Sequence, residues 1–217
     1  KKISTLTADY EVSGDGYGEG ELTCQGKRVD LRNHLVLRRL LEASVLCNNS
    51  KLLATGEPYG DPTEIALLVA AKKAGVTAEN VADQYAKLAE NPFDSVKKYM
   101  SVSVKQIGGQ RWLFVKGAVD VILDRCATAS IGNDTCFITR KLREQILNKN
   151  EELAGKALRV IGFAVKPLEP HDTVSNDSDL TFLGLAGMID PPRDEVADAV
   201  SLCKSAGIRT VMITGDH

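Results

Sequence analysis

Residues 95–117 read SVKKYMSVSVKQIGGQRWLFVKG, and this stretch decides the class of fold. Apolar and polar residues alternate as far as Ile107, the triplet GGQ follows at 108–110, and an apolar run then returns to Gly117. Alternation with a period of two is typical of a strand, and paired glycines favour a tight turn. The stretch therefore predicts an antiparallel β-hairpin that ends on a lysine and a glycine.

Helices and further strands are predicted on both sides of this hairpin. Apolar residues at helical spacing predict helices at 33–49, 61–75, 80–91, 118–126, 139–158 and 194–207. Apolar runs bounded by turn residues predict either a hairpin or a strand with a long turn at 10–22. They also predict strands at 51–55, 159–168, 180–190 and 208–217.

The start of the helix at 61–75 carries the strongest local signal. Asp61 can cap the helix, Pro62 suits the first turn, Glu64 follows three residues after the cap, and Gly75 ends the helix. At 33–49, Asn33 is the expected cap.

The last forty residues differ in organisation from the rest. They read as strand, helix and strand, which is half of a parallel α/β unit, whereas the preceding residues predict antiparallel hairpins. We expect an α+β fold, a mainly antiparallel sheet flanked by helices, with a short α/β piece at the C-terminus. The predicted domains are 1–189 and 190–217.

Composition excludes several classes of protein. The net charge of −2 over 217 residues offers no footprint for nucleic acid, and no apolar run is long enough to span a bilayer. The five cysteines are scattered and form no C-x-x-C pair, which argues against a disulfide framework and against a zinc site. No metal ligands are predicted.

The hairpin brings together residues suited to a nucleotide. Phe93 precedes it, Lys98 and Met100 share one face of its first strand by period two, and Lys116 ends its second strand. An aromatic ring can stack on a base, a thioether can pack beside it, and two lysines can meet phosphate charge. Gly117 leaves room for the ligand.

Three further groups are candidates for the same chemistry. Arg159 follows a predicted helix and could contact phosphate. Asp190 and Asp216 each come directly after an apolar strand, where α/β folds place their sites. The prolines that follow Asp190 would stiffen a hinge between domains.

Six short motifs occur in order along the chain: GDPTEIALL, NPFDSVKKYMSV, FVKGAVDVIL, ALRVIGFAV, GLAGMIDPPR and MITGDH. In this order they resemble the P-type cation-transporting ATPases, and most closely the calcium-pump branch. The resemblance covers nearly the whole chain, and DPPR and ITGD are its most specific parts.

The resemblance implies a nucleotide-binding domain, residues 1–189, followed by a hinge and the start of a phosphorylation domain. The implied ligands are ATP and Mg²⁺, and the implied partners are the phosphorylation, actuator and transmembrane domains of a pump at the cytoplasmic face of a membrane. The implied nucleotide-binding residues are Glu64, Phe93, Lys98, Lys116, Gly117, Ala118 and Arg159, and the hairpin pattern adds Met100 to them. The implied hinge and phosphorylation-domain loop are Asp190, Pro191, Pro192, Arg193, Thr214, Gly215 and Asp216.

The chain departs from the family pattern in ways that limit its chemistry. Val119 and Asp120 stand where the family has proline and glutamate, and Ser95 stands where an arginine is common. The aspartate that accepts phosphate is expected upstream of residue 1, so no catalytic residue is assigned. We expect nucleotide binding without turnover.

Two other functions compete with the ATP-binding domain of an ion pump. A stand-alone nucleotide-binding or regulatory module would have the same pocket and no transport activity. A haloacid-dehalogenase-type phosphohydrolase is suggested by the closing strand, but its D-x-D-x-[TV] motif is absent.

Overall fold

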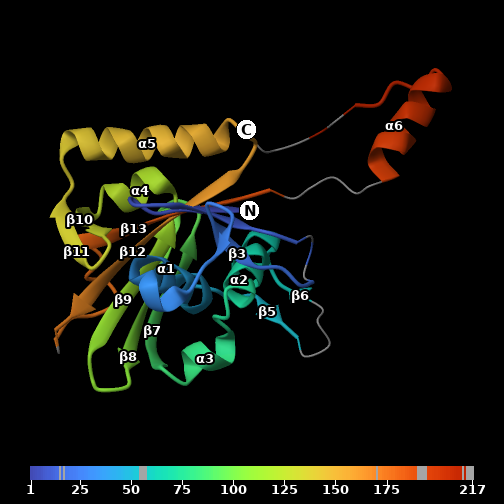
Figure 1. Ribbon diagram of the computed structural model, residues 1–217. Coiled ribbons are helices and arrows are strands. Elements are labelled where there is room, and N and C mark those ends of the chain that lie inside the picture. The colour runs from blue at the N-terminus through green and yellow to red at the C-terminus, as the bar shows by residue number, and fades with distance from the viewer. Residues whose placement is uncertain are drawn as a thin grey trace.

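The computed structural model describes residues 1–14, 16, 18–53, 58–169, 171–189, 195–211 and 213, and Figure 1 shows its central sheet with helices on both faces. The strands are β1 (Lys2–Ser4), β2 (Asp9–Val12), β3 (Leu22–Cys24), β4 (Lys27–Arg28), β5 (Lys51–Leu52), β6 (Pro58–Tyr59), β7 (Tyr85–Asp94), β8 (Tyr99–Gln106), β9 (Arg111–Gly117), β10 (Cys126–Ile131), β11 (Asp134–Phe137), β12 (Arg159–Leu168) and β13 (Leu180–Met188). The helices are η1 (Leu31–Asn33), α1 (Leu35–Leu46), α2 (Pro62–Lys73), α3 (Ala78–Ala82), α4 (Val119–Leu123), α5 (Arg140–Ala154) and α6 (Glu195–Ser205).

The main sheet is antiparallel almost throughout. Its strands run in the order β4-β3-β2-β1-β13-β12-β9-β8-β7, and β10 with β11 joins beside β13. Among the described pairs only β10 and β13 are parallel. The predicted α+β class, a mainly antiparallel sheet flanked by helices, is therefore confirmed.

Two hydrophobic layers hold the sheet between helices. On one face, Phe114 and Phe163 pack in the layer beneath α1, α2 and α3. On the other face, Leu113 and Val115 pack in the layer beneath α4 and α5. Neighbouring residues of β9 thus enter opposite layers, and a strand that is buried on both faces reads as a continuous apolar run.

The hairpin predicted at 95–117 is confirmed. β8 pairs with β9 in an antiparallel register that places Val102 opposite Phe114 and Met100 opposite Lys116. Gly108 and Gly109 turn the chain with φ of +101° and +99°, a backbone region that favours glycine. The register fixes the position at which Lys116 leaves the sheet.

The predicted cap of α2 is also confirmed. The Asp61 carboxylate accepts hydrogen bonds from the amides of Thr63 at 2.9 Å and Glu64 at 3.2 Å, and Pro62 is the first helical residue. The cap holds Glu64 in the first turn, at the end of the helix that faces β9.

The helix predicted at 80–91 is wrong for most of its length. Only α3 is helical there, and residues from Tyr85 onward form β7 at the edge of the sheet. Asn33 does not cap α1: it ends the 3-10 turn η1, and His34 is the cap residue without a side-chain hydrogen bond. In β7, residues that favour helices form a strand because they pair with β8.

The predicted parallel unit at the C-terminus is not formed by the described residues. β13 lies between β1 and β12 and is antiparallel to both, so it belongs to the main sheet. Helix α6 has no buried residue, and residues 208–211 and 213 show no strand. The domain boundary between 189 and 190 stays a prediction. No helix among the described residues is long and apolar enough to cross a membrane.

Candidate functional site

A cavity of about 470 Å³ opens where the end of β9, the start of β12, the first turn of α2 and the end of β7 meet. Its lining includes seven of the eight residues predicted to bind nucleotide. The lining residues are Asp61, Thr63, Glu64, Phe93, Lys98, Lys116, Gly117, Ala118, Arg159, Val160 and Ile161. Segments up to about a hundred residues apart in the chain thus converge on one concave surface.

Larger hollows lie elsewhere on the protein. One, of about 830 Å³, lies between the β1–β2 turn and α5, a second, of about 780 Å³, lies beside the glycine-rich stretch before β3, and a third, of about 560 Å³, lies between the β8–β9 turn and the end of β12. None of the three contains a residue that the sequence predicted for nucleotide binding. Volume therefore does not identify the candidate site. The candidate site is the cavity of about 470 Å³ in which the predicted side chains meet.

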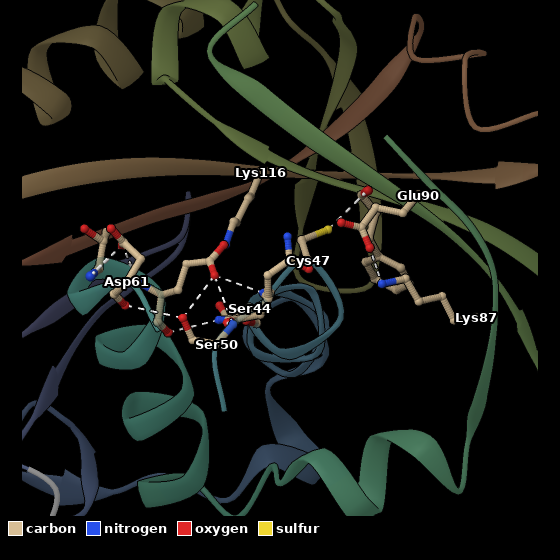
Figure 2. A network of polar contacts seen from close by, with 12 residues as sticks. Ser44, Cys47, Ser50, Asp61, Lys87, Glu90 and Lys116 are labelled. Atoms are coloured by element: carbon tan, nitrogen blue, oxygen red, sulfur yellow. Dashed lines mark hydrogen bonds and ion pairs between the residues drawn. The ribbon is translucent and has the colours of Figure 1, made fainter. Parts of the chain in front are cut away.

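At the closed end of the cavity, Lys116 and Glu64 form an ion pair. The ammonium Nζ of Lys116 lies 2.8 Å from Oε1 of Glu64, and the two side chains are 6% and 16% exposed. Lys116 leaves the sheet toward the helix, and the contacts that continue from the pair to Ser50 and Asp61 can be followed in Figure 2. A buried pair of this kind places both charges at one end of the cavity.

The second oxygen of Glu64 is held by the loop after α1. Oε2 accepts hydrogen bonds from the amide of Asn49 at 2.9 Å, from the amide of Ser50 at 3.1 Å and from the Ser50 hydroxyl at 3.1 Å. Burial by itself would raise the pKa of Glu64, but these donors and Lys116 together hold its pKa below the ordinary value. The carboxylate is therefore charged and fixed in orientation.

The floor of the cavity requires glycine at position 117. A Cβ on Gly117 would lie 2.5 Å from the carbonyl oxygen of Lys98 and 2.5 Å from Cβ of Tyr99. The next residue, Ala118, donates its amide to the same carbonyl of Lys98 at 2.9 Å. The K-G-A stretch and the turn before β8 are thereby locked together.

The open end of the cavity carries two cations and an aromatic ring. Lys98 and Arg159 are exposed, and neither is in an ion pair within the part of the chain described. Phe93 is 57% exposed although it lies within β7. A register shift between Asn91 and Asp94 leaves it on the cavity side rather than in the regular ladder.

Two predicted positions differ from the structure. Met100 is fully buried in the core beside Phe114 and does not line the cavity. The prediction applied period two from Lys98, but β8 begins at Tyr99 and Lys98 sits in the turn with φ of +59°. Lys116, expected to meet phosphate, is instead bonded to Glu64 at the closed end.

The remaining predicted residues cannot be placed. Asp190, Pro191, Pro192, Arg193, Thr214, Gly215 and Asp216 lie outside the residues that the structure describes. Their implied roles as hinge and phosphorylation-domain loop stay predictions.

The described residues do not fit a metal site. They contain no group of three His, Cys, Asp or Glu side chains that could hold an ion. Of the carboxylates that line the cavity, Glu64 is bonded to Lys116 and Asp61 caps α2.

Sequence reasoning missed part of the site. Asp61, Thr63, Val160 and Ile161 line the cavity without having been predicted for it, and Ser50 supports Glu64 from outside it. The four lining residues lie within three positions of the predicted Glu64 or Arg159, so proximity along the chain could have indicated them. No signal in the sequence pointed to Ser50.

Comparison of the sequence with known proteins identifies the family. A sequence model described as P-type ATPase, cytoplasmic domain N, matches residues 36–195. The chain is 39% identical to a calcium-transporting ATPase of Bacillus subtilis (strain 168), and this match covers 96% of the chain and 24% of that protein. It is 41% identical to calcium-transporting ATPase 1 of Lactococcus lactis subsp. lactis (strain IL1403), with 100% of the chain and 24% of that protein covered.

A third relative is the cation-transporting ATPase pma1 of Synechocystis sp., which is 42% identical over 96% of the chain and 24% of its own length. The chain thus spans about a quarter of the length of these relatives. The match of the domain model to most of the chain, together with these identities, shows that the chain belongs to the P-type ATPase family and contains its cytoplasmic domain N.

Proposed function

We propose that this chain is the ATP-binding domain of a pump that couples ATP hydrolysis to cation transport. The observation that carries the proposal is the single cavity that gathers Phe93, Glu64 and two exposed cations. An aromatic face, a fixed carboxylate and separate positive charges are complementary to a base, its amino group and a chain of phosphates.

Each part of ATP has a place in this proposal. The ring of Phe93 stacks on adenine, and Glu64 at the closed end accepts a hydrogen bond from the 6-amino group. Lys98 and Arg159 at the open end meet the phosphates, which carry Mg²⁺. We expect a dissociation constant on the order of 0.1–1 mM, because one stacked base and few phosphate contacts give only about 4–6 kcal/mol.

Phosphoryl transfer needs more than this cavity supplies. In-line transfer requires a nucleophile, a metal site and a cradle for the nucleotide at one place. The described residues contain no group of side chains that could hold a metal ion, and in this proposal they supply only the cradle. We therefore propose that the 217-residue chain binds ATP without hydrolysing it, and that other domains of the parent protein close on the γ-phosphate.

Calcium is the proposed cargo of the parent pump. Support comes from the printed names of two relatives at about 40% identity, both calcium-transporting ATPases. The choice of ion would be made in membrane segments, and none of the residues described bears on it. A stand-alone nucleotide-binding module is the alternative, and ATP-dependent calcium uptake into vesicles by the parent protein would exclude it.

The test is an ATP titration of the chain followed by amide chemical shifts. Trp112 fluorescence is a poor reporter, because Trp112 lies near the opposite end of β9 from Gly117. Phe93→Ala should weaken ATP binding about 5- to 100-fold, the range for loss of one base–aromatic stack. Phe137→Ala is the matched control: this ring is 80% exposed on β11 and does not line the cavity. Equal ATP affinity of Phe93→Ala and the parent would overturn the proposal.

A further inference from the structure

We propose that Ser50 is a positioning residue that orients the carboxylate of Glu64, so that the site prefers a 6-amino purine to a 6-oxo purine. The inference deepens the proposed function and rests on it for the identity of the ligand. Ser50 itself does not line the cavity and would not touch the nucleotide.

The two oxygens of Glu64 have unequal surroundings. Oε2 accepts three hydrogen bonds from the loop, two of them from Ser50, whereas Oε1 accepts one from Lys116. Oε1 therefore accepts a further hydrogen bond more readily than Oε2, which already has three donors. Because Glu64 lines the cavity, Oε1 is the oxygen that it offers to a ligand there.

The loop that carries Ser50 is itself fixed. Asn48 donates its side-chain amide to the carbonyls of Ser44 at 3.0 Å and Glu64 at 2.9 Å, and its Oδ1 accepts from the Ser50 amide at 2.9 Å. These bonds tie the end of α1 to the first turn of α2. The positions of the groups that donate to Oε2 are thus fixed relative to both helices.

Gly60 gives Ser50 the space that it occupies. A Cβ on Gly60 would lie 2.2 Å from the Ser50 hydroxyl oxygen, and φ at Gly60 is +128°. A side chain there would push the hydroxyl off Glu64. Ser50 is only 7% exposed, so bulk water does not readily replace Glu64 as the hydrogen-bond partner of its hydroxyl.

A fixed carboxylate discriminates between purines because it can only accept hydrogen bonds. The 6-amino group of adenine donates, whereas the 6-oxo group of hypoxanthine accepts and would meet the negative charge. Sites built around such a polar contact reject the mismatched ligand strongly. A carboxylate that is free to rotate would let the 6-oxo purine avoid this clash, so Ser50 acts on the choice of base through Glu64.

The experiment compares ATP with inosine triphosphate, which differ at purine position 6. Both are titrated into the parent chain, Ser50→Ala and Ser103→Ala, with amide spectra to check the fold. Ser103 is the matched control, since it is a buried serine, 1% exposed on β8, that does not contact Glu64. We expect Ser50→Ala to lose about 3- to 10-fold in ATP affinity and less than about 2-fold for inosine triphosphate, and Ser103→Ala to keep the parent ratio.

A second measurement needs no nucleotide. The ¹³C carboxyl signal of Glu64 is titrated with pH in the parent and in Ser50→Ala, and we expect a higher pKa in the variant because a donor to the charged form is gone. A role of Ser50 in stability alone would change neither the ratio of affinities nor this pKa.

The outcomes separate the inference from the proposed function. A parent that binds ATP and discriminates, with an unchanged ratio in Ser50→Ala, overturns the inference and leaves ATP binding intact. Equal affinity of the parent for both nucleotides likewise overturns the inference and leaves ATP binding intact. A parent that binds neither nucleotide overturns both, and an unshifted Glu64 titration removes the positioning role whatever the ligand is.

Discussion

Lys116 and Glu64 lie 52 residues apart in the chain and meet at 2.8 Å, one at the end of a strand and the other in the first turn of a helix. Each position is set by a separate local device. The β8–β9 register places the lysine, and the Asp61 cap places the glutamate. The ion pair therefore joins the sheet to α2 at the closed end of the cavity.

Replacing Lys116 by methionine should lower the free energy of unfolding by about 1–3 kcal/mol, because the buried carboxylate loses its counter-charge. The loss is moderate because Asn49 and Ser50 continue to donate to Glu64. Urea denaturation of the chain measures it. The double change Lys116→Met with Glu64→Leu should recover much of this stability, although its ATP affinity should fall because Glu64 is absent; a double variant no more stable than Lys116→Met contradicts the stated role of the pair.

Acid should remove the contribution of Glu64 to stability. Its pKa in the folded chain lies below the ordinary value of 4.5, so its stabilisation is complete above that value and is lost as the pH falls through the folded pKa. The difference in unfolding free energy between the parent and Glu64→Gln should therefore be constant from pH 7 to about pH 5 and shrink below it. A difference that grows on acidification would reverse the assigned direction.

Gly117→Ala should destabilise the chain by about 2–4 kcal/mol, because the added Cβ meets backbone and a neighbouring Cβ that cannot move freely. ATP binding should weaken with it, since the clash displaces the turn that carries Lys98. Gly155→Ala is the control, with a φ of −63° and a nearest atom at 3.2 Å. Thermal unfolding of both variants and the parent tests this; equal melting temperatures for the two variants would argue against a steric role of Gly117.

Tyr85→Phe should reduce stability without changing ATP affinity. The Tyr85 hydroxyl donates to Oε2 of Glu42 at 2.9 Å, and Glu42 is 4% exposed. Loss of the donor leaves that oxygen short of a partner at a cost of about 1–3 kcal/mol. Neither residue lines the cavity. Urea denaturation and an ATP titration of the same variant separate the two effects, and a variant that loses affinity would link this network to the site.

Local signals in the sequence predicted the parts of the fold that local chemistry decides. The GGQ turn, the alternation of β8 and the Asp61–Pro62 helix start each depend on neighbours within a few residues, and each is confirmed. The residues of β7 include Ala86, Lys87 and Glu90, which favour a helix in isolation. Their strand conformation comes from pairing with β8, which no window of the sequence shows.

Most residues that line the candidate site were predicted from the sequence, but their contacts across elements were not. Resemblance to a family supplied seven of the lining residues, whereas the hairpin pattern assigned Lys116 to phosphate and Met100 to the pocket. Spacing along the chain could not predict the positions of these two residues. The partner of Lys116 is on another element, and the alternation that was applied to Met100 begins one residue after Lys98. Pairings across elements require the tertiary structure.

The two register shifts of β7 affect more than the position of Phe93. β7 is the last strand on its side of the sheet, and extra residues near Leu88 and near Pro92 interrupt its ladder with β8. Proline offers no amide to an approaching chain, and bulges twist an exposed strand away from one. The irregularity that leaves Phe93 exposed is thus also expected to hinder pairing of β7 with a strand of another molecule. Deleting a bulge residue, which would straighten β7, should therefore make the protein self-associate.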